Sequence, residues 1–102
     1  MIIQKIHYRI FEDRLIEYMG YFDVLYNYTL DFHGVISHDL FKSLDSNSEF
    51  ILITHFRSNE DASSWFESSV RADYLRQAEN CFQELIEFNQ YDVLSTRPMF
   101  LE

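Results

Sequence analysis

Apolar and polar residues alternate at the start of the chain in the pattern of a β-strand. This strand is predicted over residues 2–11, where one face carries Gln4 among apolar side chains and the other mixes apolar with basic ones. Residues 12–28 follow with an acidic first turn and an apolar stripe at three- and four-residue spacing, which predicts a helix. The next residues, 31–34, form a loop in which Gly34 can adopt a positive φ angle.

The middle of the chain predicts a β-hairpin followed by a helix. Residues 35–44 and 50–57 have the composition of strands, and a polar turn at residues 45–48 joins them. Ser58, with Asp61 three residues later, then forms a capping-box pattern, which indicates that a helical region begins here.

The last third of the chain predicts more helix and then a short strand. The helical region is expected to break near residues 68–69, and helical spacing then resumes through Ile86. Residues 91–97 are predicted to form a final strand. Pro98 ends it, because a proline cannot continue a strand inside a sheet. The apolar tail at residues 99–101 is expected to pack against the domain.

The resulting order, β-α-β-β-α-β, predicts a ferredoxin-like α+β fold in which helices cover one face of a four-stranded antiparallel sheet. At 102 residues, the chain has room for one domain, spanning residues 1–102. Because both faces of the strands carry apolar groups, the face without helices is expected to pack against a second copy. The sequence therefore predicts a homodimer.

Composition and charge narrow the classes of function. A net charge of −9, from 17 acidic against 8 basic residues, argues against nucleic acid or an anionic membrane as a partner. The longest apolar run, residues 50–53, is too short for a membrane span or a signal peptide. Cys81 is the only cysteine, so no intrachain disulfide forms, and its place in an apolar stripe indicates an inert thiol. A cytoplasmic location is expected.

The aromatic content is high for this length, with ten Phe, seven Tyr and one Trp. Each ring buries about 150–250 Å² when it is fully enclosed. Two interpretations stay open at this point. The rings either form an unusually aromatic core, or some of them line a small-molecule pocket or a subunit interface.

Two stretches resemble the antibiotic biosynthesis monooxygenase-like family. They are Gly34-Val-Ile-Ser-His-Asp-Leu-Phe-Lys-Ser-Leu and Phe50-Ile-Leu-Ile-Thr-His-Phe-Arg-Ser, the latter followed by Asn59-Glu-Asp-Ala-Ser-Ser-Trp-Phe-Glu-Ser. The resemblance implies a dimeric α+β barrel that holds a small aromatic or apolar molecule between the sheet and the helices of each subunit. Members of this family include cofactor-free quinone-forming monooxygenases, haem-degrading enzymes and proteins with no known reaction.

The resemblance also separates the branches of the family. The haem-degrading branch carries a histidine ten positions after its helical tryptophan, and here Leu75 stands ten positions after Trp65. The same branch has an asparagine on the first strand, near the position of His7. The quinone-forming branch has an asparagine one helical turn before the tryptophan, where this chain has Asp61, a residue that the capping box already explains. Haem degradation is therefore the weaker expectation, and no cofactor is expected.

Histidines stand on three predicted strands, at His7, His38 and His55. Histidine can act as a general base, a proton relay or a metal ligand, and it is also common as a structural or surface residue. We select His7 and His55 as candidate catalytic bases, because their strands are neighbours in this fold. No HxH or HxxxH spacing occurs in the sequence, so no metal site is expected.

The candidate substrate-binding residues are Trp65, Tyr74, Arg9, Arg57 and Phe22. Trp65 could stack on a flat ligand or anchor the core, and Tyr74 with the nearby Arg71 could face the same ligand or lie on an ordinary helix surface. The leading functional hypothesis is a cofactor-independent monooxygenase, an oxidoreductase that acts on an aromatic or polyketide-like compound. The alternative is a non-catalytic protein that binds or senses a small ligand.

Overall fold

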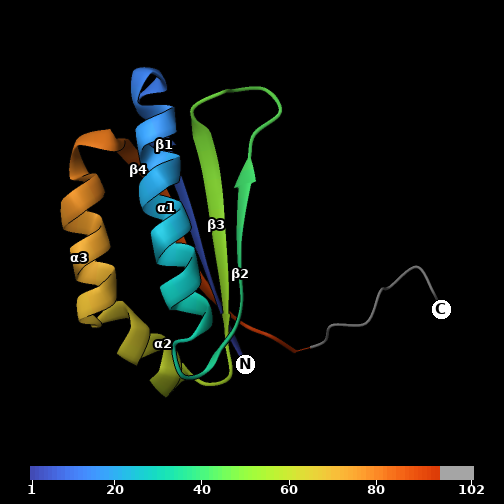
Figure 1. Cartoon of the computed structure of the whole chain (residues 1–102). Coiled ribbons are helices and arrows are strands. Elements are labelled where there is room, and N and C mark those ends of the chain that lie inside the picture. The colour runs from blue at the N-terminus through green and yellow to red at the C-terminus, as the bar shows by residue number, and fades with distance from the viewer. Residues whose placement is uncertain (95–102) are drawn as a thin grey trace.

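The computed structural model describes residues 1–94, which form one antiparallel sheet of order β2-β3-β1-β4 with helices on one side (Figure 1). The strands are β1 (Ile2–Ile10), β2 (Val35–Lys42), β3 (Glu49–Phe56) and β4 (Phe82–Asp92). The helices are α1 (Leu15–Leu30), α2 (Asn59–Phe66) and α3 (Ser69–Ala78), with 3₁₀ turns at Glu12–Arg14 and Glu79–Cys81. This arrangement confirms the predicted ferredoxin-like α+β fold.

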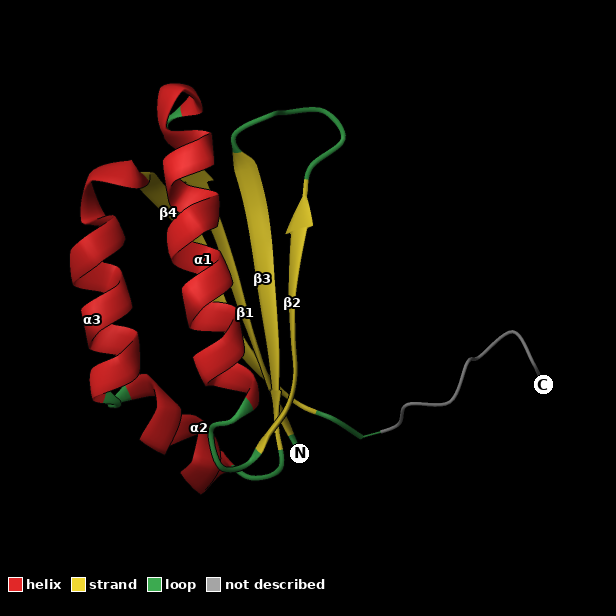
Figure 2. Cartoon of the chain, in the orientation of Figure 1, coloured by secondary structure: helices red, strands yellow, loops and turns green. Residues whose placement is uncertain are grey.

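Helices α1 and α3 lie side by side over one face of the sheet, and α2 joins the sheet to α3 at one end (Figure 2). No helix of the described residues covers the other face. The core lies between the two layers. It includes Tyr18, Phe22 and Leu25 from α1, Phe50, Leu52 and Phe56 from β3, and Tyr8 and Ile10 from β1.

Serine caps fix where the two short helices begin. The Ser58 side chain accepts a hydrogen bond from the Asp61 backbone N–H at 3.1 Å, which confirms the capping pattern at the start of α2. The Ser68 side chain accepts a hydrogen bond from the Arg71 backbone N–H at 3.2 Å and so begins α3 after the expected break. This second cap places Arg71 in the first turn of α3, where it faces the sheet.

The loop before β2 depends on a glycine. Gly34 has a φ angle of +85°, the left-handed region that other residues rarely adopt. A Cβ atom built on Gly34 would lie 2.1 Å from Cγ of Asp61, so α2 packs directly on the bare backbone here. The expectation of a positive φ angle at this residue is confirmed.

The prediction for the last third of the chain was wrong in one respect. Helix α3 ends at Ala78, and residues 82–86, for which the spacing predicts helix, form the first part of β4. Two irregularities of the β1–β4 register, between His7 and Tyr8 and between Arg9 and Ile10, explain the error. Each irregularity inserts one extra residue into β4, so the helix-facing residues are Phe82, Leu85, Phe88 and Gln90. The three-residue spacing of Phe82, Leu85 and Phe88 imitates a helical stripe.

The final strand therefore covers Phe82–Asp92 and not residues 91–97. The end of that predicted strand, Pro98 and the tail at residues 99–101 lie outside the described residues. Within residues 1–94, the helices are all too short or too polar to cross a membrane.

Candidate functional site

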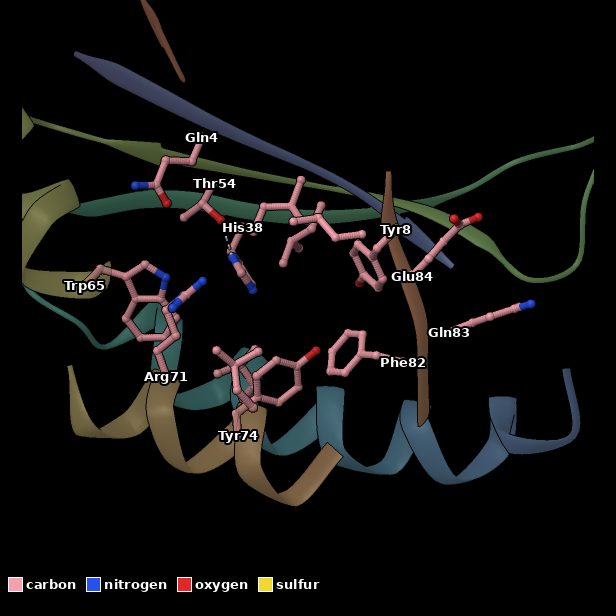
Figure 3. Close-up of a pocket in the computed structure, with 15 residues that line it drawn as sticks. Gln4, Tyr8, His38, Thr54, Trp65, Arg71, Tyr74, Phe82, Gln83 and Glu84 are labelled. Carbon is pink, nitrogen blue, oxygen red and sulfur yellow. Dashed lines mark hydrogen bonds between the residues drawn. The ribbon is translucent and has the colours of Figure 1, made fainter. Parts of the chain in front are cut away.

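A cavity of about 300 Å³ lies between the sheet and the helices (Figure 3). Its volume is at the lower end of the roughly 300–1,000 Å³ that is typical of small-molecule sites, so it suits a compact ligand. The sheet forms one side, and α1, α2 and α3 form the other. The lining residues, most of them apolar or aromatic, are Gln4, Ile6, Tyr8, Leu25, His38, Leu52, Thr54, Trp65, Arg71, Tyr74, Leu75, Phe82, Gln83, Glu84 and Leu85.

His38 points from β2 into the middle of this cavity (Figure 3). Its side chain is only 2% exposed, and its Nδ1 lies 2.7 Å from Oγ1 of Thr54. Phe22 stacks on the imidazole from behind, with ring centroids 5.7 Å apart and planes 14° apart. The other ring nitrogen, Nε2, is buried without a hydrogen-bond partner among the described residues, so it is free to meet a ligand.

Burial sets the charge of His38. Removal of the imidazole from water disfavours its charged form and lowers its pKa to about 4, while the neighbouring Asp39 carboxylate opposes this shift weakly. The imidazole is therefore neutral at pH 7. A neutral imidazole can accept a proton, which is the state that a general base requires.

A row of polar side chains crosses the sheet at this point. Thr54 pairs with His38 on one side and with Gln4 on the other, and Gln4 pairs in turn with Gln90. Directly paired residues of an antiparallel sheet point to the same face, so all four side chains face the helices. Gln4 and Thr54 are 4% and 3% exposed, which places hydrogen-bonding groups on an otherwise apolar cavity floor.

Three tyrosine hydroxyl groups form a chain beside the cavity. The Tyr18 hydroxyl, which is fully buried, is hydrogen-bonded to the Tyr8 hydroxyl and lies 2.7 Å from the Tyr74 hydroxyl. Burial raises the pKa of all three tyrosines well above the usual value, so the hydroxyl groups stay protonated. Tyr8 and Tyr74 line the cavity, whereas Tyr18 connects them from behind.

A count of protons shows that the three tyrosine hydroxyl groups can offer a hydrogen-bond donor to a ligand. Each hydroxyl group donates one hydrogen bond, and the two bonds of the chain use two of the three donors. When Tyr18 donates to Tyr8, the Tyr8 proton remains free, and when Tyr18 donates to Tyr74, the Tyr74 proton remains free. Both of these arrangements leave a donor at the cavity wall that can bind a ligand oxygen, whereas donation by Tyr8 and Tyr74 together would leave the buried Tyr18 proton without an acceptor in this group.

Trp65 and Arg71 lie together at one end of the cavity (Figure 3). Trp65 is 4% exposed, and its ring packs edge-on against Phe32 and His38. The Arg71 guanidinium lies 4.3 Å from the centre of the Phe66 ring and meets no carboxylate in residues 1–94. Partial burial lowers the pKa of Arg71, although an arginine remains charged at pH 7.

The structure brings only two of the predicted site residues to the cavity wall, Trp65 and Tyr74. Phe22 lies behind His38 in the core and holds that ring in place. Arg57 follows β3 and is exposed to solvent outside the cavity. Trp65 is buried in the core and also lines the cavity, so its interpretations as a core anchor and as a pocket wall are compatible with each other.

The structure does not bring His7 and His55 to this cavity. Both lie at strand positions that alternate with the cavity-facing residues, so their side chains are on the helix-free face of the sheet. His7 lies 3.5 Å from Glu49 on that face, and Arg9 pairs with the same glutamate and with Glu84. The predicted site residues His7, His55 and Arg9 therefore lie away from the cavity. His38, which was not selected from the sequence, points into it.

The position that corresponds to the histidine of the haem-degrading branch does not fit an iron ligand in this chain. Leu75, which stands ten positions after Trp65 and lines the cavity, has an aliphatic side chain that cannot ligate iron. Residues 1–94 also contain no cluster of three or more metal-ligating side chains.

Solved structures share this fold at low sequence identity. A candidate antibiotic biosynthesis monooxygenase from Nitrosomonas europaea matches with a TM-score of 0.85 and 15% identity, over 93% of this chain and 100% of that one. A similar candidate from Deinococcus radiodurans has a TM-score of 0.87 and 9% identity, over 97% and 98% of the two chains. Rv0793 from Mycobacterium tuberculosis has a TM-score of 0.82 and 18% identity, over 95% and 98%. These likenesses show the fold alone.

Sequence comparison gives the family. A search of curated proteins found no significant match. The sequence profile described as Antibiotic biosynthesis monooxygenase matches residues 1–86, which is most of the chain and includes α1, α2, α3 and most of the cavity. The chain therefore belongs to the antibiotic biosynthesis monooxygenase family.

Proposed function

We propose that this protein is a cofactor-independent monooxygenase that oxidises a small hydroxylated aromatic compound in the cavity. The observation that carries the proposal is the neutral His38 imidazole, with an unpartnered Nε2, inside an aromatic cavity of a monooxygenase-family chain. The aromatic walls supply flat contact surfaces, and the hydroxyl chain supplies a hydrogen-bond donor.

The first step is transfer of the phenol proton to His38. In the tautomer that serves this step, the Nδ1–H group of His38 donates to Thr54 Oγ1, and Nε2 presents its lone pair to the substrate. Its low pKa makes the free imidazole a weak base, but a phenolate formed beside it favours the imidazolium and raises that pKa. The donor from Tyr8 or Tyr74 stabilises the phenolate oxygen at the same time.

The second step is reaction of the phenolate with O₂. A ring carbon para or ortho to the oxygen has carbanion character and bonds to O₂, which forms a ring-bound peroxide. Loss of the ring hydrogen as a proton and cleavage of the O–O bond then yield a quinone and one molecule of water. The ring loses four electrons, which reduce O₂, and one oxygen atom enters the product. The mostly apolar walls limit the access of water to these intermediates.

Oxygen consumption with a panel of hydroxylated naphthalenes and anthracenes tests the proposal. The His38→Ala variant should lose most of the oxygen uptake, roughly 10²–10⁴-fold for removal of a general base. The matched control is His33→Ala, which alters an exposed histidine outside the cavity. If His7→Ala or His55→Ala removes the activity and His38→Ala does not, the base acts from the other face of the sheet and our assignment is wrong.

A non-catalytic ligand-binding role is the second candidate, and Asp61 favours it. In the quinone-forming branch, this position is expected to carry an asparagine, whereas Asp61 lies beside Gly34 and 3.8 Å from His33 and does not line the cavity. If the same compounds quench Trp65 fluorescence without any oxygen uptake, ligand binding is the only one of the two candidate functions that remains.

We also propose that the protein is a homodimer that packs through the helix-free face of the sheet, in the cytoplasm. That face carries Ile3, Ile51 and Ile53, which are only partly covered in a single chain. Sedimentation of the purified protein should give the mass of two chains, and Ile51→Asp should shift it to one. A wild-type protein that sediments as a single chain at micromolar concentration would contradict the dimer.

The lone Cys81, a buried free thiol, is consistent with the reducing compartment that we propose for this protein.

A further inference from the structure

We propose that the substrate is an aromatic compound with two functional groups, a phenol that reaches His38 and a carboxylate that binds Arg71. The phenol part rests on the proposed function. The carboxylate part rests on the cavity itself and would hold for a binding protein as well. The protein would then act on hydroxyaromatic acids in preference to neutral phenols of the same shape.

Arg71 differs from the other arginines of the described residues. Arg9, Arg14 and Arg76 each form an ion pair with a glutamate or an aspartate, and Arg57 is exposed to water. Arg71 is partly buried at the cavity wall, yet its polar contact is a long one, 3.5 Å to the Phe66 backbone carbonyl. A partly buried charge is stabilised by an opposite charge, and an anion in the cavity would supply it.

The guanidinium group is suited to a carboxylate. Its planar set of N–H donors matches the two oxygens of a carboxylate and can bind both at once. The Phe66 ring lies against the guanidinium at 4.3 Å and holds it in place, and the Ser68 cap fixes the backbone of Arg71 in the first turn of α3. These contacts restrain the side chain before a ligand binds, which reduces the entropy that binding must remove.

The cavity wall carries a positive charge at one end, which gives an anionic ligand one orientation. Arg71 and Trp65 border one end, His38 points into the middle, and Glu84 borders the other end (Figure 3). The Glu84 carboxylate is paired with Arg9 on the helix-free face of the sheet, so it places no charge inside the cavity. A carboxylate is therefore favoured at the Arg71 end, and the rest of a flat ligand extends from there towards His38.

The net charge of the chain makes Arg71 decisive. With a formal charge of −9, the protein as a whole repels an anionic ligand. Selection of an acid over a neutral compound must then come from a local cation. Arg71 is the cation that lines the cavity in the part of the chain that the structure describes.

Binding of an isosteric pair of probes tests the inference. The probes are 6-hydroxy-2-naphthoate and its uncharged amide, 6-hydroxy-2-naphthamide, titrated without oxygen by calorimetry and by quenching of Trp65, the only tryptophan. The wild-type protein should bind the acid roughly tenfold to hundredfold more tightly, as expected for charge-assisted hydrogen bonds. In Arg71→Gln, this ratio should fall to about one with the affinity for the amide unchanged.

Two further variants make the result decisive. Arg76→Gln removes an exposed arginine of the same helix that pairs with Asp73 outside the cavity, and it should keep the wild-type ratio. Arg71→Lys keeps the charge and loses the planar donor set, so it should give an intermediate ratio of the two affinities. This variant also tests the inference if Arg71→Gln does not fold. A ratio near one in the wild-type protein, or a ratio that Arg71→Gln leaves unchanged, would overturn the inference.

The same pair of probes separates this inference from the proposed function. A preference for the acid that depends on Arg71, with no oxygen consumed when either probe is added, supports the carboxylate site and contradicts the oxygenase function. Oxidation of both probes at equal rates, with equal affinities, supports the oxygenase and overturns the carboxylate site.

Discussion

Acidification should destabilise this protein through His38 in a way that can be worked out from its burial. Burial lowers the pKa of His38 to about 4 in the folded chain, whereas a histidine in the unfolded chain has a pKa of about 6.5. As the pH falls below 6.5, the unfolded chain binds a proton at this residue and the folded chain does not. The contribution of neutral His38 to stability is thus complete above pH 6.5 and is lost as the pH falls towards 4.

The expected magnitude follows from the two pKa values. Between pH 8 and pH 5, the loss at His38 is about 2 kcal/mol of the free energy of unfolding, and it approaches about 3 kcal/mol below pH 4. The side chain is 2% exposed, so screening by solvent does not greatly reduce this value. For a domain of this size, a loss of about 2 kcal/mol is a substantial part of the roughly 5–15 kcal/mol of total stability.

Urea unfolding, followed by the fluorescence of Trp65, measures the effect. The wild-type protein is compared with His38→Gln, which removes the titrating group, and with His33→Gln, which alters an exposed histidine. Protein concentration is held constant, because a dimer is stabilised by mass action. Between pH 8 and pH 5, the wild type and His33→Gln should each lose about 2 kcal/mol more than His38→Gln.

Parallel pH profiles for the wild type and His38→Gln would refute this reasoning. A difference below about 0.5 kcal/mol would mean that His38 takes up its proton equally well in the folded and unfolded chains. The imidazole would then be hydrated or paired, and the argument for a neutral base inside the cavity would fail with it.

The structure also predicts the effects of two further pairs of substitutions, one pair at tyrosines and one at glycines. Tyr18→Phe should lower the free energy of unfolding by about 1–3 kcal/mol, because it leaves two hydroxyl groups without their shared partner. Tyr21→Phe, which removes only an exposed hydrogen bond, should change that free energy by less than about 0.5 kcal/mol in the same urea titration. Gly34→Ala should destabilise the protein by about 1–3 kcal/mol, because of its positive φ angle and the clash with Asp61. Gly20→Ala, in open space on α1, should instead raise the melting temperature, since alanine is favoured over glycine by about 0.5–1 kcal/mol inside a helix. A stabilising Gly34→Ala or a destabilising Gly20→Ala would contradict this account.

Local pattern was sufficient for most of the fold. The side-chain periods of 2 and 3.6 residues are properties of the chain itself, so β1, α1 and the β2–β3 hairpin could be predicted from the order of apolar residues. Two further features are local. The Ser58 cap joins residues three positions apart, and the turn at Gly34 depends on the φ angle of one residue. The β-α-β-β-α-β order, and with it the fold class, followed from these elements.

The last strand and the site residues depended on pairing between distant segments. Two extra residues in β4 give Phe82, Leu85 and Phe88 a spacing of three, and only the register against β1 distinguishes this strand from a helix. A similar irregularity between Val35 and Ser37 reverses the phase of β2. A count from Val35 by strict alternation turns His38 away from the core, whereas the actual register pairs it with Thr54 and turns it inward.

The sequence by itself therefore determined most of the elements, their order and the family resemblance, since these depend on neighbours along the chain. It also showed that His7 and Tyr8 face opposite ways, but not which of these faces the helices cover. Only the tertiary structure decided that the cavity lies on the side of Tyr8 and His38 and not on that of His7 and His55. The physical reason is that a side chain's face is set by strand register and helix crossover, and both are fixed by contacts between residues far apart in sequence.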